Sequence, residues 1–243
     1  MKLRHFLGGT ALAISTVFIA PAYANTPALQ QLLNSKYPDM PIKVTAETPM
    51  QGVYELQLDD GSLVYTDSKA DYFMVGNLVD FKNQINLTQQ REQELNKVDV
   101  KQLPLNQAVK TVKGNGKHTL YIFTDPDCPY CKQLEKELAK MNNLTIYTFL
   151  YPIKDQHHTT KTQIAEKVWC SSNPSKAWAD FMLNGTVPTA NANCDNPISK
   201  NLALGNQLKV TGTPTIILQD GRRIAGAMPA EQLQKVLDGS KSN

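Results

Sequence analysis

The chain has 243 residues, a formal net charge of +3 and four cysteines. Its basic residues stand singly among acids along a predicted helix, as in Lys132, Glu135, Lys136, Glu137 and Lys140. This is the pattern of a solvated helix face, so the composition excludes an extended basic groove and we expect no nucleic-acid partner. The length exceeds the usual size of about 100 to 150 residues for one domain, so two domains are expected.

The first 24 residues (1–24) have the features of a secretory signal peptide. Lys2 and Arg4 give a positive start, residues 6–20 are mainly apolar, and Ala-Tyr-Ala at 22–24 fits a cleavage site. The apolar stretch is too short to span a bilayer and no later run reaches 18 apolar residues, so no membrane span is predicted. A retained N-terminal anchor is the alternative. Cleavage would lower the charge to +1 and send the chain to a compartment that permits stable disulfides.

Residues 25–85 are expected to form a small α+β domain. Leucines spaced along 28–37 predict a short helix. Four strand-length segments follow, at 42–46, 53–58, 62–67 and 72–81. Asp-Asp-Gly at 59–61 predicts a hairpin between the second and third of them. A sheet of this size has a thin core and an open edge, so we expect pairing with a second copy into a homodimer.

Residues 86–106 are polar, with only a weak apolar stripe. We interpret them as a linker helix that Pro104 ends or interrupts. Residues 107–243 then form the second domain, with its start set by typical domain size.

Two cysteines three positions apart, Cys128 and Cys131, stand between a predicted strand (119–124) and a predicted helix (132–141). A cysteine in the first turn of a helix lies among amide groups that lack an intrahelical partner, so its thiolate is favoured. We therefore interpret Cys128 as the nucleophile that attacks a disulfide, and Cys131 as the thiol that resolves the mixed disulfide. Pro129 suits the helix start because it lacks the N–H group that would have no partner there.

A zinc site and a structural disulfide are the two alternatives to a redox role for this Cys-x-x-Cys motif. A zinc site needs a second ligand pair, and the other cysteines, Cys170 and Cys194, are 24 positions apart. His157 and His158 lack a third ligand at helical spacing, so no metal or other cofactor is predicted. A structural disulfide across such a tight turn would be strained and easily reduced. Four cysteines allow three pairings.

The remaining segments alternate between helical and strand patterns. The expected elements are a strand at 144–150, helices at 161–170, 177–183 and 198–209, a loop and strand at 210–218, a hairpin turn at 219–222, a strand at 223–225 and a helix at 229–237. The helices that begin at 161 and 177 form an insertion.

This order of elements is that of a thioredoxin-like domain. A closer resemblance, to the DsbC and DsbG family of periplasmic disulfide isomerases, rests on Phe123-Thr124-Asp125, Trp169-Cys170 with Cys194, Ala203-Leu204-Gly205 and Gly212-Thr213-Pro214. Residues 52–67 resemble the dimerisation domain of the same family. The resemblance therefore spans nearly the whole chain after the signal segment.

The resemblance implies an α/β (α+β) fold, with a C-terminal thioredoxin-like domain that carries a helical insertion, a small cystatin-like N-terminal dimerisation domain and a linker helix. It implies that Pro214 is a cis-proline facing the dithiol, and that the Thr213 backbone binds an extended substrate segment. Cys170 and Cys194 match a structural disulfide of the family, which would contribute about 3 to 4 kcal/mol. Asp125 matches an acid of the family, and capping of the helix is its alternative role.

The implied activity is that of a periplasmic homodimer that isomerises or reduces incorrect disulfides in misoxidised or unfolded exported proteins. A membrane electron donor resembling DsbD would keep the dithiol reduced. One departure concerns the residues between the cysteines, since DsbC carries Gly-Tyr there and this chain carries Pro129-Tyr130, as DsbG does. That dipeptide tunes the reduction potential, so two alternatives stay open: a thiol oxidase resembling DsbA, and a dimeric chaperone with secondary redox activity.

Overall fold

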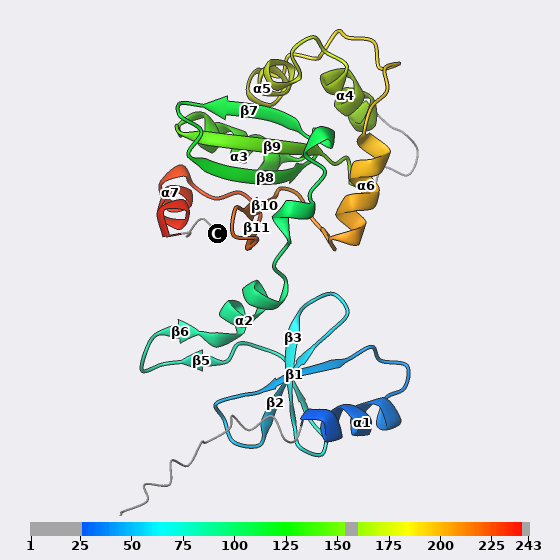
Figure 1. Ribbon diagram of the computed structural model, residues 1–243, viewed down its shortest axis with the longest axis vertical. Coiled ribbons are helices and arrows are strands. Elements are labelled where there is room, and N and C mark those ends of the chain that lie inside the picture. The colour runs from blue at the N-terminus through cyan, green and yellow to red at the C-terminus, as the bar shows by residue number, and fades with distance from the viewer. Residues whose placement is uncertain (1–25, 154–159, 240–243) are drawn as a thin grey trace, which may run out of the picture. The chain divides into compact units, whose positions relative to one another are not determined.

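The computed structural model describes residues 26–153 and 160–239 (Figure 1). It contains two compact units, a smaller one that ends at Gly76 and a larger one that begins at Asn77. Both mix helices and strands, which confirms the predicted α+β class. The predicted signal segment, 1–24, and the pair His157 and His158 lie outside the described residues. Within the described ranges, no helix is long and apolar enough to cross a membrane.

In the smaller unit, one helix packs on an antiparallel sheet. The helix is α1 (Thr26–Lys36), and the strands are β1 (Lys43–Glu47), β2 (Val53–Gln57), β3 (Leu63–Asp67) and β4 (Phe73–Met74), in the order β1-β2-β3-β4. Leu29 and Leu33 of the helix are buried in one cluster with Leu56 and Val64 of the sheet. The hairpin predicted at 59–61 is confirmed, since β2 and β3 pair directly across it.

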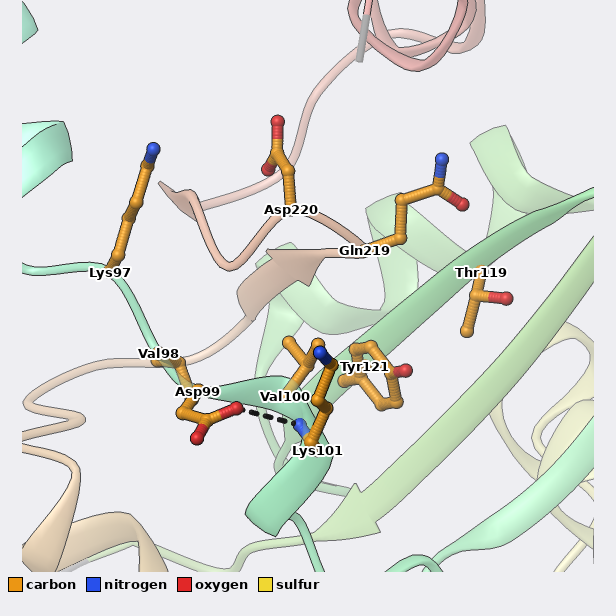
Figure 2. A pocket seen from close by; sticks show the side chains of 9 residues that line it. All are labelled: Lys97, Val98, Asp99, Val100, Lys101, Thr119, Tyr121, Gln219 and Asp220. Atoms are coloured by element: carbon orange, nitrogen blue, oxygen red, sulfur yellow. Dashed lines mark hydrogen bonds between the residues drawn. The ribbon is translucent and has the colours of Figure 1, made fainter. Parts of the chain in front are cut away.

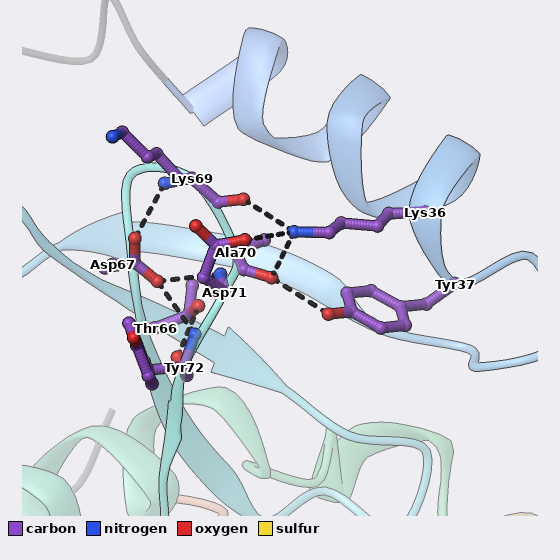
Figure 3. Close-up of polar contacts among 8 residues, drawn as sticks. All are labelled: Lys36, Tyr37, Thr66, Asp67, Lys69, Ala70, Asp71 and Tyr72. Atoms are coloured by element: carbon purple, nitrogen blue, oxygen red, sulfur yellow. Dashed lines mark hydrogen bonds and ion pairs between the residues drawn. The ribbon is translucent and has the colours of Figure 1, made fainter.

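Side-chain hydrogen bonds fix the turn between β3 and β4 (Figure 3). The Asp67 carboxylate accepts backbone N–H groups of Lys69, Asp71 and Tyr72 at 2.9 to 3.1 Å. These bonds, with that of Tyr72 the largest cause, lower the pKa of Asp67. Lys36, at the end of α1, forms an ion pair with Asp71. The helix and the turn that leads into the edge strand β4 are therefore held together.

The single strand predicted over 72–81 is wrong. Gly76 has a φ of +150°, a conformation that side chains rarely allow, and it separates β4 from β5 (Val79–Asp80). The latter strand pairs with β6 (Ile85–Asn86) in a separate two-stranded sheet. The whole segment exposes large apolar side chains, most of all Phe81 with 90% of its surface accessible.

The linker helix is shorter than the predicted 86–106. Helix α2 (Leu87–Leu95) begins at an Asn86 cap, and only two short 3-10 turns follow, η1 (Val100–Gln102) and η2 (Leu105–Gln107). The reason is that Val98 and Leu103 are both buried in one core cluster of the larger unit. Residues five apart lie about 140° apart around a helix, so a helix could not bury both against the same sheet.

We call residues 98–108 the strap, because they lie along one face of the larger unit's sheet. The Val98 amide donates a hydrogen bond to the Gly221 carbonyl at 2.9 Å. A Cβ atom at Gly221 would lie 2.3 Å from the Val98 carbonyl oxygen, and the φ of Gly221 is +85°, so glycine is required there. A cavity of about 570 Å³ between the strap and the sheet is lined by Lys97, Val98, Asp99, Val100, Lys101, Thr119, Tyr121, Gln219 and Asp220 (Figure 2).

The larger unit contains a five-stranded sheet. Its strands are β7 (Val109–Lys113), β8 (His118–Thr124), β9 (Leu144–Leu150), β10 (Thr215–Leu218) and β11 (Arg223–Ala225), in the order β11-β10-β8-β9-β7. Only β8 and β9 are parallel. The edge strand β7 is not predicted by the sequence patterns, because Val109 is its only buried residue.

Helices cover both faces of this sheet. Buried leucines of α3 (Pro129–Ala139) and α7 (Ala230–Gly239) pack on one face. The strap and α6 (Ile198–Gln207) pack on the other. The predicted insertion is present as α4 (Thr160–Trp169) and α5 (Pro174–Asn184). This arrangement confirms the predicted thioredoxin-like architecture and leaves the carboxyl end of β8 to carry the cysteine motif.

Candidate active site

The two cysteines of the motif lie where β8 leads into α3, and both are free thiols. Cys128 is the N-cap of the helix, and its Sγ accepts a hydrogen bond from the Cys131 backbone N–H at 3.3 Å. Pro129 occupies the first helical turn, as predicted from its missing N–H group. The amide group and the positive end of the helix dipole would both stabilise a negative charge on Cys128 Sγ.

The sheet brings a distant loop to this dithiol. Because Thr215 pairs with Phe123 in adjacent strands, the residues before Thr215 lie beside the end of β8. The Thr213–Pro214 peptide bond in that loop is cis. The Cys128 thiol donates a hydrogen bond to the Thr213 carbonyl at 3.2 Å, across 85 positions of sequence.

The two thiols differ sharply in their surroundings. Cys128 is partly exposed, whereas Cys131 is 1% exposed. Burial is the main cause that raises the pKa of Cys131 to about 12. Tyr130, between them, is 62% exposed. An incoming disulfide can therefore reach Cys128, while Cys131 stays protonated and covered.

Asp125 lies three residues before Cys128 and is 4% exposed. One carboxylate oxygen accepts the Asp127 N–H at 2.9 Å, and the other lies 3.3 Å from Lys161 Nζ. Asp125 therefore fixes the turn and does not cap the helix, since Cys128 is the N-cap. Burial is the largest influence on its pKa, which is raised. No local pattern marks Lys161, because its partner is 36 positions away.

Replacing Asp125 by Asn should stabilise the fold at pH 7. The raised pKa means that the folded state disfavours the ionised carboxyl, so stability is lost as the pH rises through that pKa. Asn can still accept the Asp127 N–H and carries no charge. Denaturant unfolding of both proteins should show a gain at pH 7 that shrinks towards zero below pH about 3.9, the usual carboxyl value. A variant less stable at pH 7 would contradict this, and would give the ion pair with Lys161 the larger effect.

Cys170 and Cys194 form a disulfide with a Cα–Cα distance of 5.8 Å. It joins the end of α4 to the segment that precedes α6. Among residues 26–153 and 160–239, no group of three or more His, Cys, Asp or Glu side chains could hold a metal ion.

Comparison with known proteins identifies the scaffold. Residues 105–241 match the thioredoxin-like domain family, and residues 20–89 match the N-terminal domain of disulfide bond isomerase proteins. A dithiol at the start of a helix on a thioredoxin-like scaffold places the chain among the thiol-disulfide oxidoreductases.

Similarity to individual proteins shows which family of thiol-disulfide oxidoreductases the chain resembles. The chain is 40% identical to the probable thiol:disulfide interchange protein DsbC of Bordetella pertussis over 207 residues, which are 85% of this chain and 72% of the relative. It is 29% identical to DsbC of Escherichia coli K12 over 239 residues, 95% of each chain. A crystal structure of a disulfide interchange protein from Neisseria gonorrhoeae is 38% identical, with a TM-score of 0.55, and covers 58% of this chain and 100% of that one. The chain belongs to the DsbC family of thiol:disulfide interchange proteins.

Proposed function

We propose that this protein is a periplasmic thiol-disulfide isomerase and reductase that acts on misoxidised exported proteins. The observation that carries the proposal is the contrast between a reachable Cys128 and a buried Cys131. The Cys128 thiolate attacks one sulfur of a client disulfide, forms a mixed disulfide, and releases the other client sulfur as a thiolate. The Thr213 backbone beside Cys128 would pair with the extended client segment.

The mixed disulfide can be released by two routes. If a client thiolate attacks the client sulfur of the mixed disulfide, a new client disulfide forms and Cys128 leaves as a thiolate, which is isomerisation. If Cys131 attacks Cys128, the client leaves reduced and the two electrons come from the protein's dithiol. Cys131 must first lose its proton, and its raised pKa makes that rare at neutral pH. The slow second route gives client thiols time to act, so the geometry favours isomerisation.

The assembly and the partners form the second part of the proposal. The edge strand β4 and the exposed apolar residues near it support pairing of two copies through the N-terminal unit. The predicted signal segment supports export to the periplasm. A reductase that has been oxidised at Cys128 and Cys131 needs an electron source, and a membrane donor resembling DsbD would supply it.

The redox state of the dithiol in cells distinguishes this function from that of an oxidase. Cells would be quenched in acid, and free thiols would be alkylated with a reagent that adds mass. An isomerase kept reduced should show Cys128 and Cys131 mainly alkylated. A dithiol found mainly oxidised would overturn the proposal and favour the DsbA-like oxidase. The Cys170 and Cys194 pair should stay unlabelled in either case and serves as an internal control.

A further inference from the structure

The disulfide of the insertion and the neighbouring tryptophan join the same two segments of chain. Cys170 directly follows Trp169 at the end of α4, and Cys194 directly precedes Asp195. The Trp169 indole N–H donates a hydrogen bond to the Asp195 carbonyl at 3.2 Å. The covalent bond thus holds the carbonyl that orients the indole.

The same tryptophan shares a packing cluster with the dithiol. Trp169 and Cys128 both pack on one cluster of buried side chains that includes Cys131. Trp169 is itself only partly buried. Trp169, Ile164 and Cys128 are the partly buried apolar residues at the rim of this cluster.

The second tryptophan of the chain has a different environment. Trp178 is 3% exposed, and its indole N–H donates to a Glu135 carboxylate oxygen at 2.7 Å. This bond ties α5 to α3 in the interior. Trp178 consequently serves as a matched control for an effect of tryptophan loss on packing alone.

We propose that Trp169 determines client specificity, and that the Cys170–Cys194 disulfide positions it. The indole ring would contact an apolar side chain next to the client cysteine that Cys128 attacks. Aromatic rings offer a large apolar contact at a small loss of conformational freedom, which suits recognition of many clients. This inference rests on the proposed disulfide exchange at Cys128. It specifies in addition that client segments with an apolar side chain next to the cysteine are preferred.

Two disulfide peptides that differ only in Leu or Ser beside the cysteine would test the specificity. With a small-molecule thiol in excess to return the dithiol to its reduced form, we expect the wild-type protein to reduce the Leu peptide with a kcat/KM about five- to tenfold higher, as partial burial of a leucine side chain implies. Trp169→Ala should remove this preference by raising KM for the Leu peptide, with kcat for the Ser peptide unchanged. Trp178→Phe should keep the preference. A Trp169→Ala protein that still prefers the Leu peptide would overturn the proposal.

The positioning role of the disulfide needs its own variant. Replacing Cys170 and Cys194 together by Ala keeps Trp169 but frees the loop, and it should also remove most of the preference while preserving exchange with the Ser peptide. Retention of the preference would show that the ring acts without the disulfide, and would overturn the proposed positioning role of the Cys170–Cys194 disulfide. If neither peptide is reduced by the wild-type protein, the proposed function fails; if both are reduced equally, only the specificity inference fails.

Fluorescence provides a test that does not require the protein without the Cys170–Cys194 disulfide to fold. In a protein with Trp178→Phe and Cys131→Ala, Trp169 is the only tryptophan and the mixed disulfide with the peptide is trapped. The Leu peptide should shift Trp169 emission to shorter wavelength, because it excludes water from the ring, and the Ser peptide should not. Identical spectra for the two trapped complexes would contradict the proposed contact.

Discussion

Replacement of Cys128 by Ala should reduce disulfide exchange about 10³-fold or more, because removal of a nucleophile leaves no other group to form the covalent intermediate. Cys131 cannot substitute for it, since Cys131 is buried and protonated at neutral pH. The measurement is the recovery of activity by an enzyme whose disulfides have been scrambled, with a thermal melt to show that the variant is folded.

The matched control is Cys131→Ala. This variant should still attack clients and should accumulate mixed disulfides, visible as higher-mass species on a non-reducing gel. A Cys128→Ala protein that refolds scrambled clients as well as the wild type would contradict the isomerase proposal. It would favour the chaperone alternative, in which the client-binding surface acts without redox chemistry.

Removal of residues 98–106 of the strap should cost the larger unit about 3 to 6 kcal/mol of stability. A fragment that begins at Gln107, where the domain is expected to start, lacks Val98 and Leu103, each 6% exposed in the complete chain. Burial of one such side chain contributes about 1.5 to 3 kcal/mol. Denaturant unfolding of this fragment and of one that begins at Lys97 would measure the difference.

Point variants in the full chain check the same effect. Leu103→Ala should destabilise the larger unit by about 2 to 4 kcal/mol, since it removes a buried leucine side chain. Lys101→Ala, at an exposed position of the strap, should change stability by less than about 0.5 kcal/mol. Equal unfolding midpoints for the two fragments would show that the strap is not part of the folded core.

Local patterns in the sequence account for much of the larger unit. The strand before Cys128, the helix after it and the insertion helices have apolar residues at the correct periods, and they lie within a few residues of their predicted positions. The predicted linker helix over 86–106 is too long, because the path of the strap depends on a distant sheet face that buries Val98 and Leu103. The edge strand β7 is not predicted, because an edge strand with one buried residue has no distinctive sequence pattern.

Some features of the active site are likewise predictable from local sequence, and others depend on tertiary structure. The spacing of Cys128 and Cys131 identifies the dithiol without any tertiary information. The proximity of Thr213 follows from the family resemblance and depends physically on pairing between β8 and β10, which no local pattern encodes. The contacts of Asp125 with Lys161 and of Trp169 with Asp195 arise from the placement of α4, so they become visible only in the folded chain.

The high pKa of Cys131 also determines how the two release routes compete as the pH changes. A client thiol with the usual pKa of about 8.5 and Cys131, with a pKa of about 12, both gain thiolate tenfold per pH unit at neutral pH. The ratio of isomerisation to reduction should therefore stay constant up to pH about 8.5. Above that value the client thiolate saturates while the Cys131 thiolate keeps rising, so alkaline conditions shift the products towards reduced clients.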